Sequence, residues 1–137
     1  MECWNLQRKS MKKNEYVPTA VKLSKKNLLK EISFNIENTP LKFVVEEEKK
    51  TDAETHSSVA DLFFIISGKM VFTCNGKLVN PKKSPIYQNT LVADKIKNGK
   101  KIILKAGEWL FIPANCPHQR TNLKKSRFIV VKVPTNG

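Results

Sequence analysis

The chain has only two histidines, and each lies at the edge of an apolar run. His56 stands in "TDAETHSSVADLFFIISG", between the carboxylates of Glu54 and Asp61, and His118 follows the apolar run of "GEWLFIPANCPHQRTN". Because side chains alternate along a strand, Glu54 and His56 are predicted to point the same way. If both edges line one end of a barrel, two imidazoles and two carboxylates converge there. This pairing is the main functional clue, because the sequence shows no Ser or Cys triad for nucleophilic catalysis and no Gly-rich phosphate loop.

The segments that must position these side chains are typical of β structure. From residue 33 onward, short runs rich in Val, Ile and Phe are separated by turn signals, which indicates an all-β sandwich or barrel. Strands are predicted in "LKFVVEEE", "LFFIIS", "KMVFTC", "KIILKAGEWLFIP" and "RFIVVKVP". In the first of these, Leu41, Phe43 and Val45 are expected to share one face. The aromatic residues of the strands are expected to form core layers: Phe63, Phe64, Trp109, Phe111 and Phe128.

Turn signals and composition divide the rest of the chain. Asn75-Gly76 and Asn98-Gly99 predict tight hairpins, since both central positions of a type I′ turn favour positive φ. Residues 79–96 are expected to form a long connection with a strand at its end. Residues 1–32 are predicted to be a basic N-terminal arm with a short helix, "KKNLLKEI", capped by Ser24. Residues 33–137 then make a single β domain.

The stretch around His118 has the pattern of a known motif. The chain resembles the cupins, whose second motif reads G(x)5PxGxxH(x)3N. Gly107, Pro113, His118 and Asn122 match that motif, with Asn115 in place of its middle glycine. Asn tolerates the left-handed backbone better than most residues, so this replacement is mild.

The stretch around His56 matches the first cupin motif, G(x)5HxH(x)3,4E(x)6G, in its spacing. Glu54 stands where the first histidine would be, His56 is the second, Asp61 replaces the glutamate, and Gly68 is kept. The opening glycine is absent, because Glu48 occupies that position. The resemblance extends over residues 40 to 133. More narrowly, the chain is similar to a group of small single-domain cupins with the pattern ExHxxxxD, whose role is generally unassigned. The resemblance implies a jelly-roll β-barrel of two antiparallel sheets and a homodimer.

In the cupins, the corresponding side chains bind a divalent metal inside the barrel. Carried over, the candidate ligands are Glu54, His56, Asp61 and His118, a set that suits Fe, Mn, Ni or Zn. Asp61 is one methylene shorter than glutamate, so pairing with a lysine is an alternative for it. Gln119, Arg120 and Asn122 are candidates for the ligand pocket, and an inward-facing Arg120 could clamp a carboxylate, its alternative being an exposed side chain.

Composition limits the remaining classes of function. The chain of 137 residues, 40% hydrophobic and 27% charged, is expected to be one ordinary globular protein without a signal peptide or membrane span, and therefore cytoplasmic. Cys3, Cys74 and Cys116 are odd in number and widely spaced, so reduced thiols are expected. The net charge of +13 is almost all lysine and shows no stripe interleaved with aromatics, so nucleic acid is not the expected partner.

Two functions remain open. The first is a metal-dependent cupin enzyme of dioxygenase or isomerase type that acts on a small organic molecule. The second is a metal-free barrel that binds or senses a small molecule without catalysis. No nucleotide cofactor is expected in either case.

Overall fold

The described part of the chain is built from strands. The computed structural model describes residues 20, 22, 24, 33–35 and 39–135. No helix occurs among these residues, which confirms the predicted all-β class. The strands are β1 (Phe34–Asn35), β2 (Leu41–Glu46), β3 (Lys49–Lys50), β4 (Ala53–His56), β5 (Val59–Ser67), β6 (Lys69–Cys74), β7 (Lys77–Leu78), β8 (Lys82–Lys83), β9 (Thr90–Ala93), β10 (Ile96–Lys97), β11 (Lys100–Lys105), β12 (Trp109–Ile112), β13 (His118–Asn122) and β14 (Ser126–Pro134).

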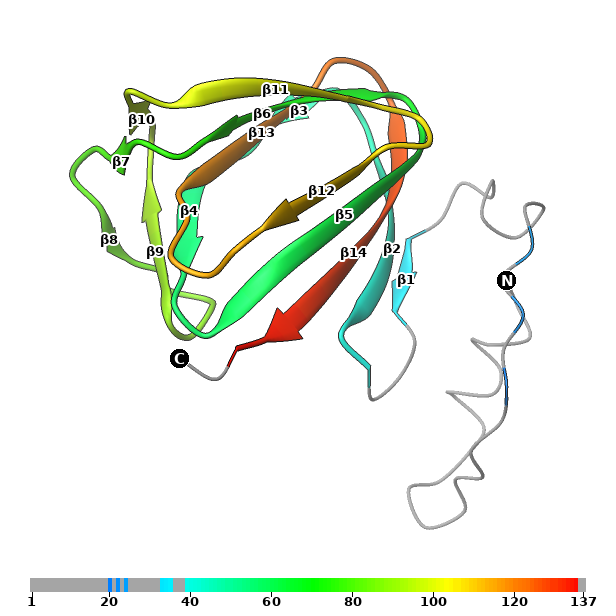
Figure 1. Ribbon diagram of the computed structural model, residues 1–137, viewed down its shortest axis with the longest axis horizontal. Coiled ribbons are helices and arrows are strands. Elements are labelled where there is room, and N and C mark those ends of the chain that lie inside the picture. The colour runs from blue at the N-terminus through cyan, green and yellow to red at the C-terminus, as the bar shows by residue number, and fades with distance from the viewer. Residues whose placement is uncertain (1–19, 21, 23, 25–32, 36–38, 136–137) are drawn as a thin grey trace, which may run out of the picture.

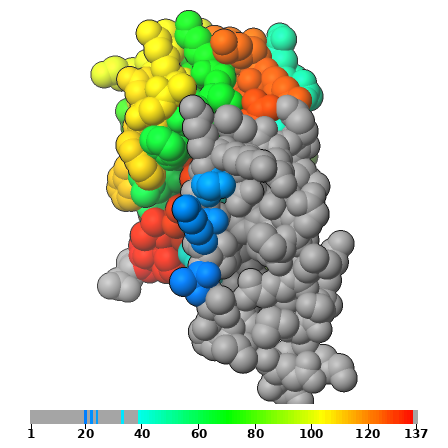
Figure 2. Space-filling view, turned by 90° about the vertical axis from the view of Figure 1, so that its right-hand side faces the viewer, coloured from blue at the N-terminus to red at the C-terminus, as the bar shows by residue number. Residues whose placement is uncertain are grey.

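Two antiparallel sheets face each other and close into a barrel (Figure 1). One has five strands in the order β1-β2-β14-β5-β12, and the other has the order β11-β6-β13-β4-β9-β8, with β3 also paired to β13. The spatial order β11, β6, β13, β3 can be followed along the top of Figure 2, as yellow, green, orange and turquoise atoms. Most neighbouring strands are far apart in the sequence, as in the pairs β14-β2, β14-β5, β12-β5 and β13-β6, so each sheet brings distant segments together.

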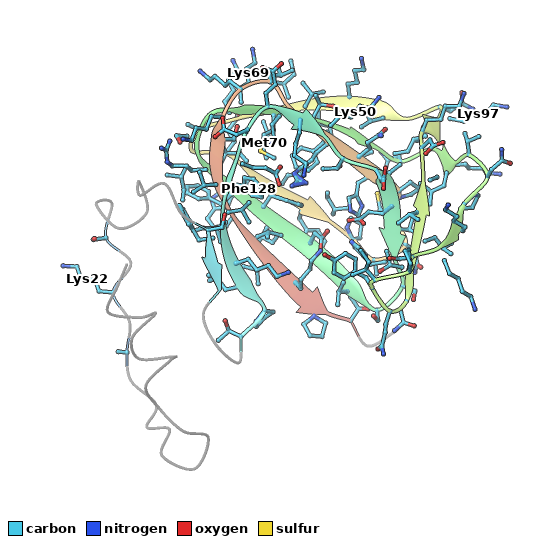
Figure 3. The ribbon with its side chains drawn as sticks, turned by 180° about the vertical axis from the view of Figure 1, so that it is seen from behind. Lys22, Lys50, Lys69, Met70, Lys97 and Phe128 are labelled. Carbon is cyan, nitrogen blue, oxygen red and sulfur yellow. The ribbon has the colours of Figure 1, made fainter. Side chains whose placement is uncertain are left out.

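The space between the sheets is filled at one end by aromatic and aliphatic side chains. Phe63 packs edge-on against Phe72 with ring centroids 4.9 Å apart, and against Phe128 at 5.9 Å. Ile65 and Met70 complete the centre of this cluster and are fully buried. In Figure 3, Met70 and Phe128 lie inside the barrel, whereas Lys50 and Lys97 point outward. This hydrophobic core lies next to the polar site and forms one wall of its cavity.

Alternation in β2 turns its polar side chains toward the cavity of the barrel, where Lys42 stays exposed and Glu46 is partly buried. Leu41, Phe43 and Val45 do share a face, but that face lies outside, where Phe43 packs with Val45, Ile66 and Ile129. The inward face carries Lys42, Val44 and Glu46, which line the pocket described below.

The prediction that all five strand aromatics form core layers holds for Phe63 and Phe128 and is wrong for Phe64, Trp109 and Phe111. Trp109 and Phe111 are 59% and 57% exposed, because alternation turns Leu110 and Ile112 inward instead. Trp109 contacts Phe64 on the outer surface, with ring centroids 4.3 Å apart. The presence of apolar residues in this strand therefore did not show which of its faces is buried.

The two Asn-Gly dipeptides do not join hairpins, which corrects that prediction. Strand β6 pairs with β11, and β7 pairs with β10 in a separate two-stranded sheet, so Asn75-Gly76 lies across from Asn98-Gly99 between these two pairings. Asn75, Gly76 and Asn98 have positive φ. A positive φ suits a kink in a ladder as well as a turn, because bulges use the same left-handed conformation.

Three further predictions, on residues 79–96, on the N-terminal arm and on membrane spans, have different outcomes. Residues 79–96 contain three short strands, β8, β9 and β10, of which β9 pairs with β4 beside the candidate site. The predicted N-terminal helix over residues 25–32 lies outside the described residues, and the division into an arm of residues 1–32 and a domain of 33–137 stays a prediction. Across the described ranges, no helix long and apolar enough for a membrane span is found.

Gly68 and Gly107, the glycines that end the first motif and begin the second, offer a matched test of the fold. Both have positive φ, at +101° and +88°. A Cβ on Gly68 would collide with the buried Ser126, whereas a Cβ on Gly107 would meet nothing within 4 Å. Gly107→Ala is expected to lower the free energy of unfolding by about 1–2 kcal/mol through backbone strain alone, and Gly68→Ala by about 3 kcal/mol or more. Urea denaturation measures both, and equal losses would contradict this packing.

Candidate functional site

The four residues singled out around the two histidines come together inside the barrel. Glu54 and His56 lie on β4, and His118 begins the neighbouring β13, directly opposite Glu54 in the ladder. Asp61 lies on β5 in the facing sheet and is 1% exposed. The cluster therefore bridges the two sheets, and each member depends on the barrel for its position.

The imidazole nitrogens and the carboxylate oxygens are close neighbours. The Nε2 atom of His56 lies 3.2 Å from Oε1 of Glu54 and 3.4 Å from Oδ2 of Asp61. The Nε2 atom of His118 lies 3.5 Å and 3.4 Å from the same two oxygens. The two rings are tilted by 52°, with centroids 5.2 Å apart. One small volume thus contains two nitrogens and two oxygens that all face inward.

Hydrogen bonds at the far side of each ring fix which nitrogen faces inward. Nδ1 of His118 lies 3.0 Å from the Cys116 carbonyl oxygen, which can only accept, so this nitrogen carries the proton. The Thr90 hydroxyl donates to the Gln88 carbonyl at 3.0 Å, and Nδ1 of His56 lies 3.0 Å from Thr90 Oγ1. The His56 Nδ1–H is therefore the donor in that contact. In the neutral form, both rings present the Nε2 lone pair to the carboxylates.

The loop before His118 holds that residue against the first motif. Asn115 has φ +66°, in agreement with its predicted role in place of glycine. Its backbone N–H donates to the His56 carbonyl at 2.7 Å, and the Pro117 carbonyl accepts from the Asn75 N–H at 3.0 Å. These bonds tie the proline-bounded loop to β4 and to the end of β6, so the spacing of the motif sets the place of His118.

Asp61 has two different partners, one for each oxygen. Its Oδ1 lies 2.7 Å from the ammonium of Lys132 on β14, and its Oδ2 faces the two imidazoles. Lys132 lies directly opposite Asp61 in the ladder between β14 and β5. Both alternatives considered for this residue, a lysine pair and a contact with the histidines, are present at once.

The close contacts shift the pKa values of the cluster. Burial alone would raise the pKa of Glu54, but the close imidazoles of His118 and His56 outweigh it and lower this pKa to about 2. Burial opposes the same contacts at Asp61, where both histidines and Lys132 hold the pKa well below its usual range. Burial would lower the pKa of His118, but the Asp61 and Glu54 carboxylates raise it to about 9. The His56 pKa is raised by the same carboxylates.

The donor set fits a divalent metal. Glu54, His56 and His118 each offer one ligand atom, and these atoms lie within 4.8 Å of one another. A tetrahedral ion with bonds of about 2.1 Å separates its ligand atoms by about 3.4 Å, close to the nitrogen–oxygen distances of 3.2 to 3.5 Å found here. Among the described residues, neither Nε2 atom has a hydrogen-bond partner with proper geometry. The outward Nδ1 bonds are also those that orient histidine ligands of metals.

The three residues predicted for the ligand pocket have different surroundings. The Gln119 amide donates to the backbone carbonyls of Thr51 and Asp94, at 2.9 and 3.1 Å, and does not line the pocket. Arg120 does line the pocket, with its guanidinium 2.8 Å from both oxygens of Glu46 and 5.1 Å from the Phe128 ring centre.

Asn122 is fully buried and supports Arg120 indirectly. Its amide donates to Glu46 Oε1 at 2.7 Å and to the Glu47 carbonyl at 3.2 Å. Arg120 and Asn122 thus hold Glu46 between them, and the Arg120 charge is already neutralised. The alternative of an exposed Arg120 side chain is not what the structure shows, because its side chain is 18% exposed.

The pocket itself is a cavity of about 740 Å³ between the sheets. The four clustered residues and Arg120 line it, together with the core aromatics Phe63, Phe72 and Phe128. Sequence reasoning missed four charged pocket residues, Lys42, Glu46, Asp52 and Lys132. For the three that lie on strands, the available signal was alternation: each is on the same face of its strand as a residue that points into the barrel, Val44 for β2 and Phe128 for β14.

The raised histidine pKa predicts how the metal-free protein responds to alkali. A pKa raised from 6.5 to about 9 means that protonated His118 stabilises the fold below pH 6.5, and that this contribution is lost as the pH rises through 9. In the presence of a chelator, we expect the free energy of unfolding to fall by on the order of 3 kcal/mol across that window. His118→Gln should remove most of the slope in urea-denaturation series. A slope that is the same in both proteins would contradict the proposed protonation.

Comparison with known proteins finds similarity in structure alone. No protein-family model and no curated protein sequence matches the chain. A crystal structure of hydroquinone 1,2-dioxygenase PnpCD, in complex with Cd2+ and 4-hydroxybenzonitrile, is similar at a TM-score of 0.50 and 16% identity, covering 70% of this chain and 58% of that one. The ycfD protein of E. coli is similar at a TM-score of 0.52 and 18% identity, covering 71% and 25%.

A third similar structure is the cupin domain of CENP-C from Drosophila melanogaster, with a TM-score of 0.49 and 12% identity, covering 72% of this chain and 64% of that one. The chain spans less than two thirds of the length of each of these three structures. At such low identities, the likeness to the dioxygenase and to ycfD shows the fold alone. Taken with the two facing antiparallel sheets, it shows that this chain has the cupin fold, a jelly-roll β-barrel.

Proposed function

We propose that the protein binds one divalent metal between its sheets and acts there on a small organic molecule. The proposal is carried by one observation, the convergence of two Nε2 atoms and two carboxylate oxygens at 3.2 to 3.5 Å. Glu54, His56 and His118 would hold the metal. Asp61, tied to Lys132 through Oδ1, would complete the set with Oδ2 or orient it from the facing sheet.

The chain's own residues prepare such a site for chemistry. Thr90 and the Cys116 carbonyl hold the two rings, and the aromatic floor of Phe63, Phe72 and Phe128 restricts water on one side. A bound divalent metal would supply Lewis acidity, or the activation of dioxygen if it is redox-active. The similar hydroquinone 1,2-dioxygenase PnpCD was solved in complex with Cd2+ and 4-hydroxybenzonitrile, which is in line with this proposal.

A second candidate function is a metal-free binding or sensing barrel. It is favoured by the raised pKa values of both histidines, because two protonated rings would neutralise the two carboxylates without a metal. Metal and protons compete for the same Nε2 atoms, so the two functions are distinguished by metal content. The cytoplasmic location, the homodimer and the absence of a nucleic-acid partner stay predictions.

Metal content after loading and gel filtration tests the first function. We expect about one divalent ion per chain in the wild type, because the donor set matches a single ion. His118→Ala and Glu54→Gln should each lower the content several-fold, measured by elemental analysis. Asp52→Asn is the matched control, since this carboxylate lines the pocket but contacts neither histidine. A wild type that takes up no metal, or variants that retain all of it, would contradict the proposal and leave the metal-free barrel.

The hydroxyl of Thr90 tests the orienting contact to His56. Thr90→Val keeps the shape of the side chain and removes the acceptor of the Nδ1–H bond, so we expect metal affinity to fall about 10-fold. Competition with a chromophoric chelator measures the affinity. Thr55→Val serves as the control, because Thr55 lies one residue from His56 on the same strand and does not line the pocket. An equal effect of both substitutions would show that Thr90 does not orient the ring.

A further inference from the structure

The charges of the pocket are unevenly paired. Three cations line the cavity, from Lys42, Arg120 and Lys132, and four carboxylates line it, from Glu46, Asp52, Glu54 and Asp61. Arg120 is neutralised by Glu46 at 2.8 Å, and Lys132 by Asp61 at 2.7 Å. Among the described residues, no carboxylate forms an ion pair with Lys42. This lysine is the cation of the pocket that remains open to a ligand.

The register of the ladder places Lys42 near Lys132, which contacts the candidate metal centre. Lys42 lies opposite Val130 in the ladder between β2 and β14, and Lys132 follows two residues after Val130 on the same face. Diagonal neighbours of this kind lie roughly 7–8 Å apart, within reach of long side chains. Lys132 in turn contacts Asp61, whose other oxygen faces both imidazoles. An anion beside both lysines would therefore lie next to the four clustered side chains.

The net charge of the metal-loaded site favours an anion. With neutral histidines, the four carboxylates outnumber the three cations by one. A divalent ion turns that deficit into an excess of one positive charge. A single negative charge on a ligand would balance this excess.

The rest of the cavity is suited to an apolar body. Phe63, Phe72 and Phe128 make the floor. At the mouth, Ile86 and Tyr87 line the pocket while 77% and 59% exposed. Ser84 holds this segment, because its hydroxyl accepts from the backbone N–H groups of Ile86 and Tyr87, at 3.2 and 3.0 Å. The volume of about 740 Å³ is within the usual range of small-molecule sites.

We propose that the ligand of this pocket is a small organic monoanion, such as a carboxylate with an apolar body, whose charged end is recognised by Lys42. This inference rests on the proposed function in that it names the class of molecule on which the same site acts. Arg120, a candidate clamp for a carboxylate in the sequence, is instead paired with Glu46.

Binding of matched acids and amides tests this inference. Acetate, butyrate and benzoate would be titrated by calorimetry at low ionic strength, where charge contacts are least screened, beside acetamide, butyramide and benzamide. At least one acid should bind about 10-fold more tightly than its amide, because a hydrogen bond to a charged group contributes about that much. Lys42→Gln should remove this preference and Lys42→Arg should restore it. Lys101→Gln, an exposed lysine of β11 outside the pocket, should leave it unchanged.

The outcomes separate this inference from the proposed function when metal content is measured on the same samples. An acid preference that depends on Lys42, in a protein that takes up no metal, supports the anion site and contradicts the metal function. Metal uptake without any acid preference supports the metal function and contradicts the anion site. A preference that survives Lys42→Gln, or that Lys101→Gln removes equally, overturns the assignment to Lys42.

Discussion

The site depends on one electrostatic constraint: two imidazole nitrogens and two carboxylate oxygens face each other in a largely buried space. In the neutral state of the rings, all four atoms are acceptors, and a group of acceptors without positive charge is unfavourable where water is excluded. The ammonium of Lys132 supplies part of the required positive charge, at Asp61. The remainder has to come from a metal ion or from protons on the histidines, and the shifted pKa values of Glu54 and His118 express the same demand.

The barrel maintains this unfavourable arrangement by holding each group from outside. The rings are fixed through Nδ1, by a side chain at His56 and by a backbone carbonyl at His118. Asn115, with its left-handed backbone, binds the second motif to the His56 carbonyl, so the two histidines cannot separate without breaking main-chain contacts. The aromatic core lies beneath them and resists collapse. Preorganisation of this kind is what a metal or a charged ligand exploits, because little reordering accompanies its binding.

Sequence reasoning predicted the fold class and the residues of the central cluster, because both rest on local patterns. Fixed spacings around His118 and His56 mark the two motifs, and alternation marks the strands. The residues that these side chains contact could not be predicted in the same way. Lys132 meets Asp61, and Glu46 meets Arg120, through ladders and layers that join segments about 70 positions apart in the chain. The Asn-Gly dipeptides misled for a related reason, since a positive φ predicts a local bend without specifying which strands it joins.

The central claim is that the two Nε2 atoms and the carboxylates form one metal-binding set. X-ray absorption spectroscopy of the zinc-loaded protein tests it most directly, because it identifies the ligand atoms themselves. The account predicts a shell of nitrogen and oxygen at about 2.0–2.1 Å with the outer scattering of two imidazoles, and no sulfur. A sulfur shell at about 2.3 Å, which would place the ion on a cysteine, or a spectrum without imidazole scattering, would contradict it.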